Sequence, residues 1–195
     1  MKQSLINQFI SKERFESYAN LSEYNDNLIF SKKAYIPLSI LEITLKNSIN
    51  KLLTYKIGEK WYEDKSFLTV DSLKKVNQAK DILFRRGEKI IKSKIIAELS
   101  FGFWVNLFKK PYAKRLRTGD LKMIFLNFPS KVEKTINREV VYKKLNHIRN
   151  FRNRIFHYER VLNKDNFNTI FDEIYEILNY FDNEISNYSR DLNSQ

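Results

Sequence analysis

The sequence contains no cysteine, and this absence excludes several kinds of site at once. A chain without cysteine forms no disulfide framework, has no thiolate nucleophile and offers no cysteine ligand to zinc. It also has only four glycines and three prolines in 195 residues. So few turn-forming residues disfavour a many-stranded sheet and favour long helices joined by short connections. The composition therefore predicts an all-α fold.

Long hydrophobic runs are absent as well. No apolar stretch approaches the roughly 18 residues that a membrane span needs, and the first residues lack the hydrophobic region of a signal peptide. We therefore expect a cytoplasmic protein that does not span a membrane. A hydrophobic share of 43% over 195 residues is enough for a real core, so we expect residues 1–195 to form a single domain.

Acidic residues are outnumbered, which gives the chain a net charge of +12. The excess is uneven, because residues 85–130 carry a net +8, residues 131–160 carry +6 and residues 161–195 carry −5. Such a field attracts polyanions, nucleic acid above all, although charge alone leaves an anionic membrane surface open. The charge distribution therefore predicts a polyanionic partner.

Hydrophobic spacing predicts helices over residues 25–55, 71–86, 95–108, 120–128, 131–156 and 165–188. We expect Pro37 to kink or divide the first of these. Ser11 should cap a short helix near the start of the chain, and Asp71 should cap the second long one. The apolar helix over 95–108 is expected in the core, although four of its aromatic residues could instead stack on bases. These four are Phe101, Phe103, Trp104 and Phe108.

One basic segment, residues 144–160, contains both histidines of the chain among many arginines and asparagines. In it Arg152 and Asn153 are followed by His157. Because a helix turns 100° per residue, Asn153 and His157 lie one turn apart on one face, while Arg152 lies near the edge of the apolar stripe. That core-facing stripe consists of Val141, Leu145, Ile148, Phe151 and Ile155.

A guanidinium, an amide and an imidazole are groups that can hold a phosphodiester and move protons around it. We therefore interpret Arg152, Asn153 and His157 as candidate catalytic residues. The alternative is a solvated face or a buried structural histidine, since this spacing also arises by chance. The sequence has no glycine-rich phosphate loop and no paired-histidine metal motif. RNA supplies its own nucleophile, the 2′-OH, so its cleavage requires neither a metal nor another cofactor.

Three segments, in order, resemble the Abi-like family of bacterial abortive-infection proteins, the AbiD/AbiF group. They are residues 41–50 followed by 58–62, residues 96–108, and residues 145–159, which look like the family's HEPN-type Arg-x4-6-His signature. Lys46 stands where arginine is usual, Phe156 replaces a small residue, and His147 departs from a more usual arginine. We give His147 no catalytic role.

The resemblance implies a HEPN-like helical bundle with additional N-terminal helices, and a motif helix over about 131–156. It implies a homodimer through the motif helix that brings two motifs together, and a metal-independent endoribonuclease toxin of phage defence. On this interpretation His157 is the acid or base, Arg152 contacts the scissile phosphate and Asn153 orients these side chains. The resemblance also implies a small non-coding RNA as antitoxin.

Other cations are candidate RNA contacts. Arg149, Arg154 and Arg160 could guide the RNA backbone beside the motif. A second group belongs to residues 109–117, which form either an RNA-contact loop or a solvated connector. Its cations are Lys109, Lys110, Lys114, Arg115 and Arg117.

Two polar residues, Glu42 and Asn47, interrupt the apolar pattern of the helix predicted over 25–55. They either hydrogen-bond between helices or, as the resemblance suggests, orient the motif arginine. Two other function classes stay open beside the nuclease: a module that binds a structured RNA without cutting it, and a protein-interaction scaffold whose basic face is incidental.

Overall fold

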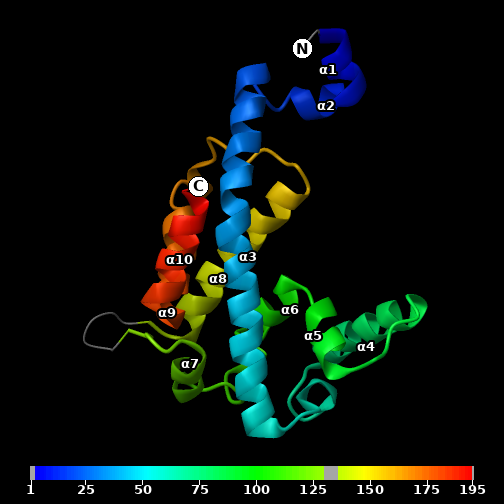
Figure 1. Cartoon of the computed structure of the whole chain (residues 1–195), viewed down its shortest axis with the longest axis vertical. Helices are drawn as coiled ribbons and strands as arrows, with labels where there is room; N and C mark the ends of the chain where they lie inside the picture. The colour runs from blue at the N-terminus through cyan, green and yellow to red at the C-terminus, as the bar shows by residue number, and fades with distance from the viewer. Residues whose placement is uncertain (1–2, 130–135, 195) are drawn as a thin grey trace.

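The computed structural model describes residues 3–129 and 136–194 of the chain. Over these residues the chain forms ten α-helices and three short 3-10 helices, and no strand (Figure 1). The predicted all-α fold is thus confirmed. Within the same residues, no helix combines the length and the apolarity that crossing a membrane requires.

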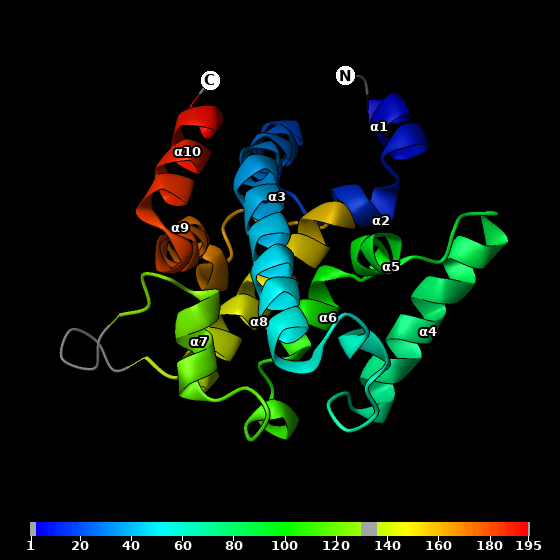
Figure 2. The same cartoon turned by 60° about the horizontal axis from the view of Figure 1, so that its bottom comes forward.

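The longest helix, α3 (Leu21–Ile57), runs along the long axis of the molecule, and other helices lie on both sides of it (Figures 1 and 2). It begins at Asn20, whose side chain accepts a hydrogen bond from the backbone N–H of Glu23 at 3.0 Å. Pro37 does not divide it. The buried proline ring packs in the core, which offsets the one backbone hydrogen bond that proline cannot make.

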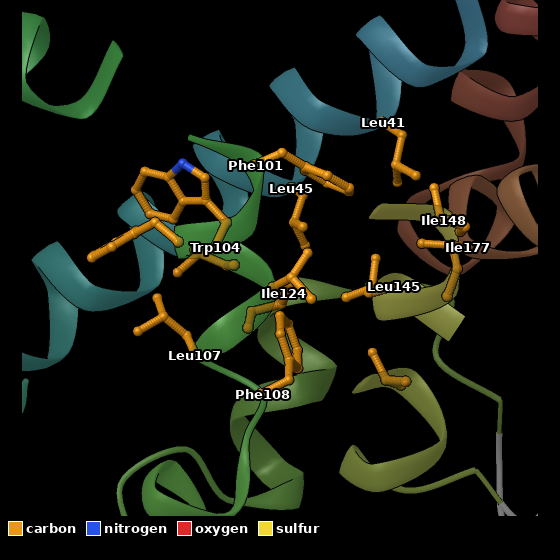
Figure 3. Close-up of a cluster of buried hydrophobic side chains, with 14 of the residues drawn as sticks. Leu41, Leu45, Phe101, Trp104, Leu107, Phe108, Ile124, Leu145, Ile148 and Ile177 are labelled. Carbon is orange, nitrogen blue, oxygen red and sulfur yellow. The ribbon is translucent and has the colours of Figure 1, made fainter. Parts of the chain in front are cut away.

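The core is one cluster of apolar side chains that joins α3 to α6 (Phe101–Asn106), α8 (Arg138–Phe156) and α9 (Ile170–Phe181). Figure 3 shows residues from all four helices in this cluster, among them Leu45, Trp104, Leu145 and Ile177. The four aromatic residues of the 95–108 segment are all at least 97% buried, so their core assignment is confirmed and base stacking on them is wrong.

The single helix expected over 95–108 is wrong. The chain forms α5 (Lys92–Glu98) and α6, which are separated by extended backbone at Leu99 and Ser100. Leu99 is buried and its carbonyl accepts a hydrogen bond from the Trp104 indole at 3.3 Å. The break lets apolar residues of both short helices reach the core, which one straight helix could bury on a single face only.

The helix expected over 165–188 is also divided. It consists of the 3-10 helix η3 (Asp165–Phe167), α9 and α10 (Asn183–Asn193), with Asp182 in extended backbone between the last two. The Asp182 carboxylate accepts a hydrogen bond from the backbone N–H of Glu184 at 2.8 Å and so starts α10.

The motif helix α8 begins later than expected. Residues 136 and 137 are not helical, and Asn137 caps the helix by accepting from the backbone N–H of Val140 at 3.0 Å. The predicted start at residue 131 lies outside the described residues. Four other helices of the described chain are short, and Ser11 caps the second of them as predicted. They are α1 (Gln3–Phe9), α2 (Lys12–Phe15), η1 (Trp61–Glu63) and η2 (Lys110–Tyr112).

Two further helices lie where the sequence predicted them, but they begin and end at other residues than predicted. Helix α4 (Val70–Arg85) is capped by the side chain of Thr69 and not by Asp71, because the Thr69 hydroxyl accepts from the backbone N–H of Ser72. Helix α7 (Thr118–Ile124) replaces the helix expected over 120–128.

Candidate functional site

The candidate site lies at the carboxyl end of α8. The five stripe residues Val141, Leu145, Ile148, Phe151 and Ile155 are all buried, as the helical spacing predicted. Burial of one stripe fixes the rotation of the helix about its axis, so the residues between the stripe positions face outward. Asn153 and His157 are exposed as a consequence.

His157 directly follows Phe156, the last residue of α8. Its backbone N–H donates to the carbonyl of Asn153 at 3.0 Å, so it follows the helical path although it stands one residue beyond the helix. The next residue, Tyr158, has a φ of 57°, and the backbone N–H of Glu159 returns to the carbonyl of Arg154 at 2.9 Å. This is the Schellman arrangement, in which a left-handed residue closes a helix.

The side chains of Asn153 and His157 make no hydrogen bond and no ion pair with any residue that the structure describes. Both side chains sit on exposed residues one turn apart. An imidazole placed in this way can accept or donate a proton at a bound ligand without first breaking a contact in the protein.

Arg152 is held at the edge of the buried stripe. Its Nε lies 3.7 Å from the Oε2 atom of Glu42 on α3, and its guanidinium carbon lies 4.5 Å from the centre of the Phe156 ring. This separation is an ion pair and not a hydrogen bond, and the buried Nε of Arg152 has no hydrogen-bond partner among the described residues. Glu42 thus lies beside the motif arginine, and both interpretations of Glu42 stay open. Asn47 lies elsewhere, on the wall of a cavity between α3 and α5.

Two nearby arginines, Arg149 and Arg154, already have partners within the protein. Arg149 lies over Gly102 and donates to the side-chain oxygen of Asn106 at 3.3 Å. Arg154 pairs with Glu159 at 2.8 Å. Guanidinium groups with such partners keep their charge, but an RNA phosphate would compete with contacts that they already make.

Arg160 has the most contacts of the candidate RNA-binding arginines. It donates to the carbonyl of Ser17 at 2.5 Å, pairs with the carboxylate of Glu23 and lies 5.8 Å from the centre of the Tyr18 ring. These contacts join the segment after α8 to the segment between α2 and α3. Arg160 thus joins two segments of the chain that are about 140 positions apart in sequence.

His147 faces a different environment from His157. Its Nδ1 lies 2.9 Å from the Oε2 atom of Glu173 on α9, and its ring stacks on Phe167 with centroids 5.4 Å apart. The contacts place this histidine between two helices, where it packs and pairs.

Two cavities flank the ion pair between Arg154 and Glu159, and both residues line each of them. One cavity, of about 310 Å³, also has His147 and Asn153 on its wall. The other, of about 470 Å³, extends toward α2. The candidate site is therefore a hollowed surface, and the exposed amide of Asn153 lies on the wall of the smaller cavity.

Three residues that support this site were not singled out in the sequence: Arg14, Glu23 and Asn27. Arg14 Nη1 donates to the carbonyl of Tyr158 at 2.7 Å. Asn27 is 1% exposed, and its side-chain oxygen accepts from the backbone N–H groups of Val161 and Leu162 at 2.8 and 3.0 Å. All three fix the segment that follows His157.

A carboxylate near this segment has a shifted pKa. The hydrogen bond from the backbone N–H of Ala19, at 2.6 Å, lowers the pKa of the Glu23 carboxyl below its ordinary value of 4.5, and the charge of Arg160 lowers it further. Glu23 is thus an anion under ordinary conditions and attracts Arg160.

The second group of candidate RNA contacts lies at the other end of α8. Arg138, the first residue of α8, donates to the carbonyl of Phe108, directly before the basic segment. A helix of this length separates its ends by about 27 Å. Both candidate RNA surfaces could thus bind one strand, but they cannot hold the same phosphate.

The cations of the basic segment are all on exposed residues: Lys109, Lys110, Lys114, Arg115 and Arg117. The segment is anchored beneath them, since Tyr112 and Leu116 are buried and Arg115 donates to the carbonyl of Phe67 at 2.7 Å. Four of these side chains have no acidic partner in the described part of the chain, and Arg115 contacts a neutral carbonyl. Their charges are available to a polyanion.

Taken together, the fold and the site define an all-helical protein with an exposed, unpartnered histidine and amide at the end of a basic helix. In the described residues no three histidine, aspartate or glutamate side chains cluster in a way that could hold a metal ion. Comparisons with protein-family models, with curated proteins and with solved structures found no match to this chain.

Proposed function

We propose that this chain is a HEPN-like, metal-independent endoribonuclease toxin of bacterial phage defence that acts in the cytoplasm. The observation that carries the proposal is that the His157 side chain is exposed and, in the described part of the chain, unpaired. The residue is exposed at the end of a basic helix and its ring has no partner among the described residues, while Asn153 lies one turn before it. The resemblance of residues 145–159 to the Abi-like signature supports the same activity.

In the proposed reaction the 2′-OH of one nucleotide attacks the adjacent phosphorus and the 5′-oxygen of the next nucleotide leaves. One imidazole accepts the 2′-OH proton and a second donates a proton to the leaving oxygen. Arg152 stabilises the charge that develops on the phosphate oxygens. The products carry a 2′,3′-cyclic phosphate and a 5′-hydroxyl.

The reaction uses two imidazoles, whereas each chain offers one exposed histidine at this site. A homodimer would supply the second. The surface beside the motif supports this arrangement, because α3 exposes Leu28 and Tyr35 at 41% and 60%, and Phe156 and Tyr158 are exposed next to them. A cavity of about 350 Å³ lies between these two groups of residues. Burying such side chains against a second copy is favourable.

The toxin requires restraint, since unrestrained RNA cleavage is lethal to the cell that makes it. A small non-coding RNA is the proposed antitoxin. A net charge of +12 and the exposed cations of residues 109–117 support an RNA partner, because each phosphate contact releases a counterion.

The test is cleavage of labelled RNA in the presence of a metal chelator, by purified protein freed of bound RNA. Wild type and His157→Ala are compared, and the product ends are identified. We expect wild type to cut and to leave cyclic-phosphate ends, and we expect His157→Ala to lose at least about a hundredfold in rate.

Other outcomes identify the alternatives. If both proteins bind RNA in a salt-sensitive way and neither cuts, the chain is a binding module for a structured RNA. If neither binds RNA, the basic face is incidental and an interaction scaffold is the better assignment.

A further inference from the structure

A cavity of about 510 Å³ lies between α3 and α5, apart from the cavities at the end of α8. This volume is in the range of sites that hold a small organic ligand, roughly 300–1,000 Å³. Its wall combines polar and apolar groups. Lys46, Asn47 and Asn50 come from α3, whereas Ser93, Ile96 and Ala97 come from α5.

The polar groups on the wall differ in how they are held. The Asn50 side-chain oxygen accepts from the indole N–H of Trp61 at 2.9 Å, and Trp61 is fully buried. The Asn50 amide is thereby fixed, and its nitrogen is left as a hydrogen-bond donor at the wall. Lys92 is committed elsewhere, since its ammonium binds Thr54 at 2.6 Å and Glu59 at 2.7 Å.

The side chains of Lys46 and Asn47 are unpaired in the described part of the chain. Neither side chain makes a hydrogen bond or an ion pair with any residue in the described ranges 3–129 and 136–194. The cavity thus presents a free ammonium, one free and one fixed amide, a serine hydroxyl and an aliphatic surface. No acidic side chain is on its wall.

This set of groups matches a nucleotide. An asparagine amide can both donate to and accept from the edge of a base, and aliphatic side chains contact the flat face of the base. An ammonium group binds a phosphate as a point charge. The absence of a carboxylate from the wall removes the repulsion that a phosphate would otherwise meet.

The cavity is also close to the candidate catalytic residues. Lys46 follows Glu42 by one turn of α3, so both lie on the same face of that helix. Glu42 in turn holds Arg152 at 3.7 Å. Arg152 and the cavity therefore lie within about one or two turns of α3 of each other, a distance that adjacent nucleotides of one strand can span.

We propose that the cavity between α3 and α5 is a nucleotide subsite for the RNA strand near its scissile phosphate, with Lys46 on a phosphate and Asn47 and Asn50 on a base. The proposal rests on the ribonuclease function proposed above and deepens it. The subsite would give the enzyme a base preference that the motif residues alone do not supply.

The experiment measures binding of short single-stranded RNAs of different base composition to the full chain carrying His157→Ala, so that the RNA stays intact. Lys46→Met and Asn47→Ala are added to that background. Lys51→Met is the matched control, because Lys51 is an exposed lysine of the same helix outside the cavity and its loss changes the net charge equally.

We expect Asn47→Ala to weaken binding of the preferred RNA about tenfold and binding of the other RNAs by less than about twofold. Lys46→Met should weaken binding of every RNA several-fold more than Lys51→Met does. The subsite is overturned if both cavity variants behave like the control while wild type still cuts RNA. In that case the ribonuclease function stands without this subsite.

A separate measurement applies if wild type neither cuts nor binds RNA, which would overturn the proposed function. Each of the four nucleoside 5′-monophosphates is then titrated into the protein by NMR. Shifts at the cavity residues that disappear in Lys46→Met would support nucleotide binding by the cavity. The lack of any such shift would overturn it as well.

Discussion

Arg152 lies between the Glu42 carboxylate, 3.7 Å from its Nε, and the ring of Phe156. We expect Glu42→Gln to lower the cleavage rate constant kcat about tenfold, because the guanidinium is then less well placed for the transition state. KM for RNA should stay constant or fall, since one negative charge near the strand is lost. Single-turnover and steady-state cleavage assays separate the two effects.

The control for this variant is Glu139→Gln. Glu139 pairs with Lys143 at 3.0 Å on the exposed surface of α8, and its loss changes the net charge by the same amount. An equal effect of both variants on kcat would mean that Glu42 acts through general charge and has no positioning role.

Asn27 is a buried polar residue in an apolar row of α3. Asn27→Ala leaves the backbone N–H groups of Val161 and Leu162 without an acceptor, and we expect a loss of about 2–4 kcal/mol in the free energy of unfolding. Denaturant unfolding measures it. Asn25→Ala, at an exposed position of the same helix, should cost less than about 0.5 kcal/mol. Equal losses in the two variants would contradict a stabilising role for the hydrogen bonds of Asn27.

At the scale of elements, α8 ends in a way that strains one residue. Tyr158 occupies the left-handed position that glycine usually takes. Because the Tyr158 side chain is 69% exposed, we expect Tyr158→Gly to stabilise the fold by about 1 kcal/mol. Tyr158→Ala removes the same side chain and keeps the strain, so it should bring no gain. Thermal unfolding of both variants tests this, and a gain in Tyr158→Ala would show that the side chain itself is unfavourable.

The stability of the connection between α2 and α3 is expected to depend on pH through the carboxylate of Glu23. The pKa of Glu23 is lower in the folded chain than its ordinary value of 4.5, because the Ala19 N–H binds the ionised form. The stability that Glu23 contributes is therefore fully present above 4.5 and is lost as the pH falls through the lowered pKa. Hydrogen bonds lower the pKa of three other carboxyl groups as well: Lys80 donates to Glu63, Ser66 to Asp64 and Lys94 to Glu88.

A comparison with Glu23→Gln isolates this one carboxylate. We expect the variant to melt at a lower temperature than wild type at neutral pH, and we expect the gap to close as the pH falls below 4.5. Melting temperatures measured over this range check the sign. A gap that widens in acid would contradict it.

The sequence predicts those features of a helix that local spacing determines, and it does not predict helix ends that depend on tertiary packing. The rotation of α8 follows from a stripe of five apolar residues, and local spacing is sufficient to find it. The breaks at Leu99 and Asp182 do not follow from spacing. Each lies within a stretch whose apolar residues continue on both sides of the break, and only packing against the rest of the core decides where the helix stops.

The candidate site shows the same limit. Adjacency along one helix predicts that Asn153 and His157 share a face, whereas the contact of Arg14 with Tyr158 joins residues 144 positions apart. Asn27 could have been found, because it lies seven residues before Ala34 in the apolar row of α3 and breaks that row. No local pattern marks Arg14 or Glu23.

For the whole molecule, the apolar surface beside the motif predicts association. We expect the chain to be a dimer in solution and Tyr35→Asp to make it a monomer that still binds RNA but cuts it at least about tenfold more slowly. Sedimentation and cleavage assays measure both. Tyr55→Asp is the control, since Tyr55 is 80% exposed toward the other end of α3. A monomeric wild type that cuts RNA would contradict the dimer.

The contacts of Arg14 and Asn27 with residues 158–162 also set an order of events during synthesis. A ribosome makes the first helices early, but their partners in the site emerge only when most of the chain has been translated. The site therefore cannot be completed until residues 158–162 have left the ribosome, however early α2 and α3 have formed.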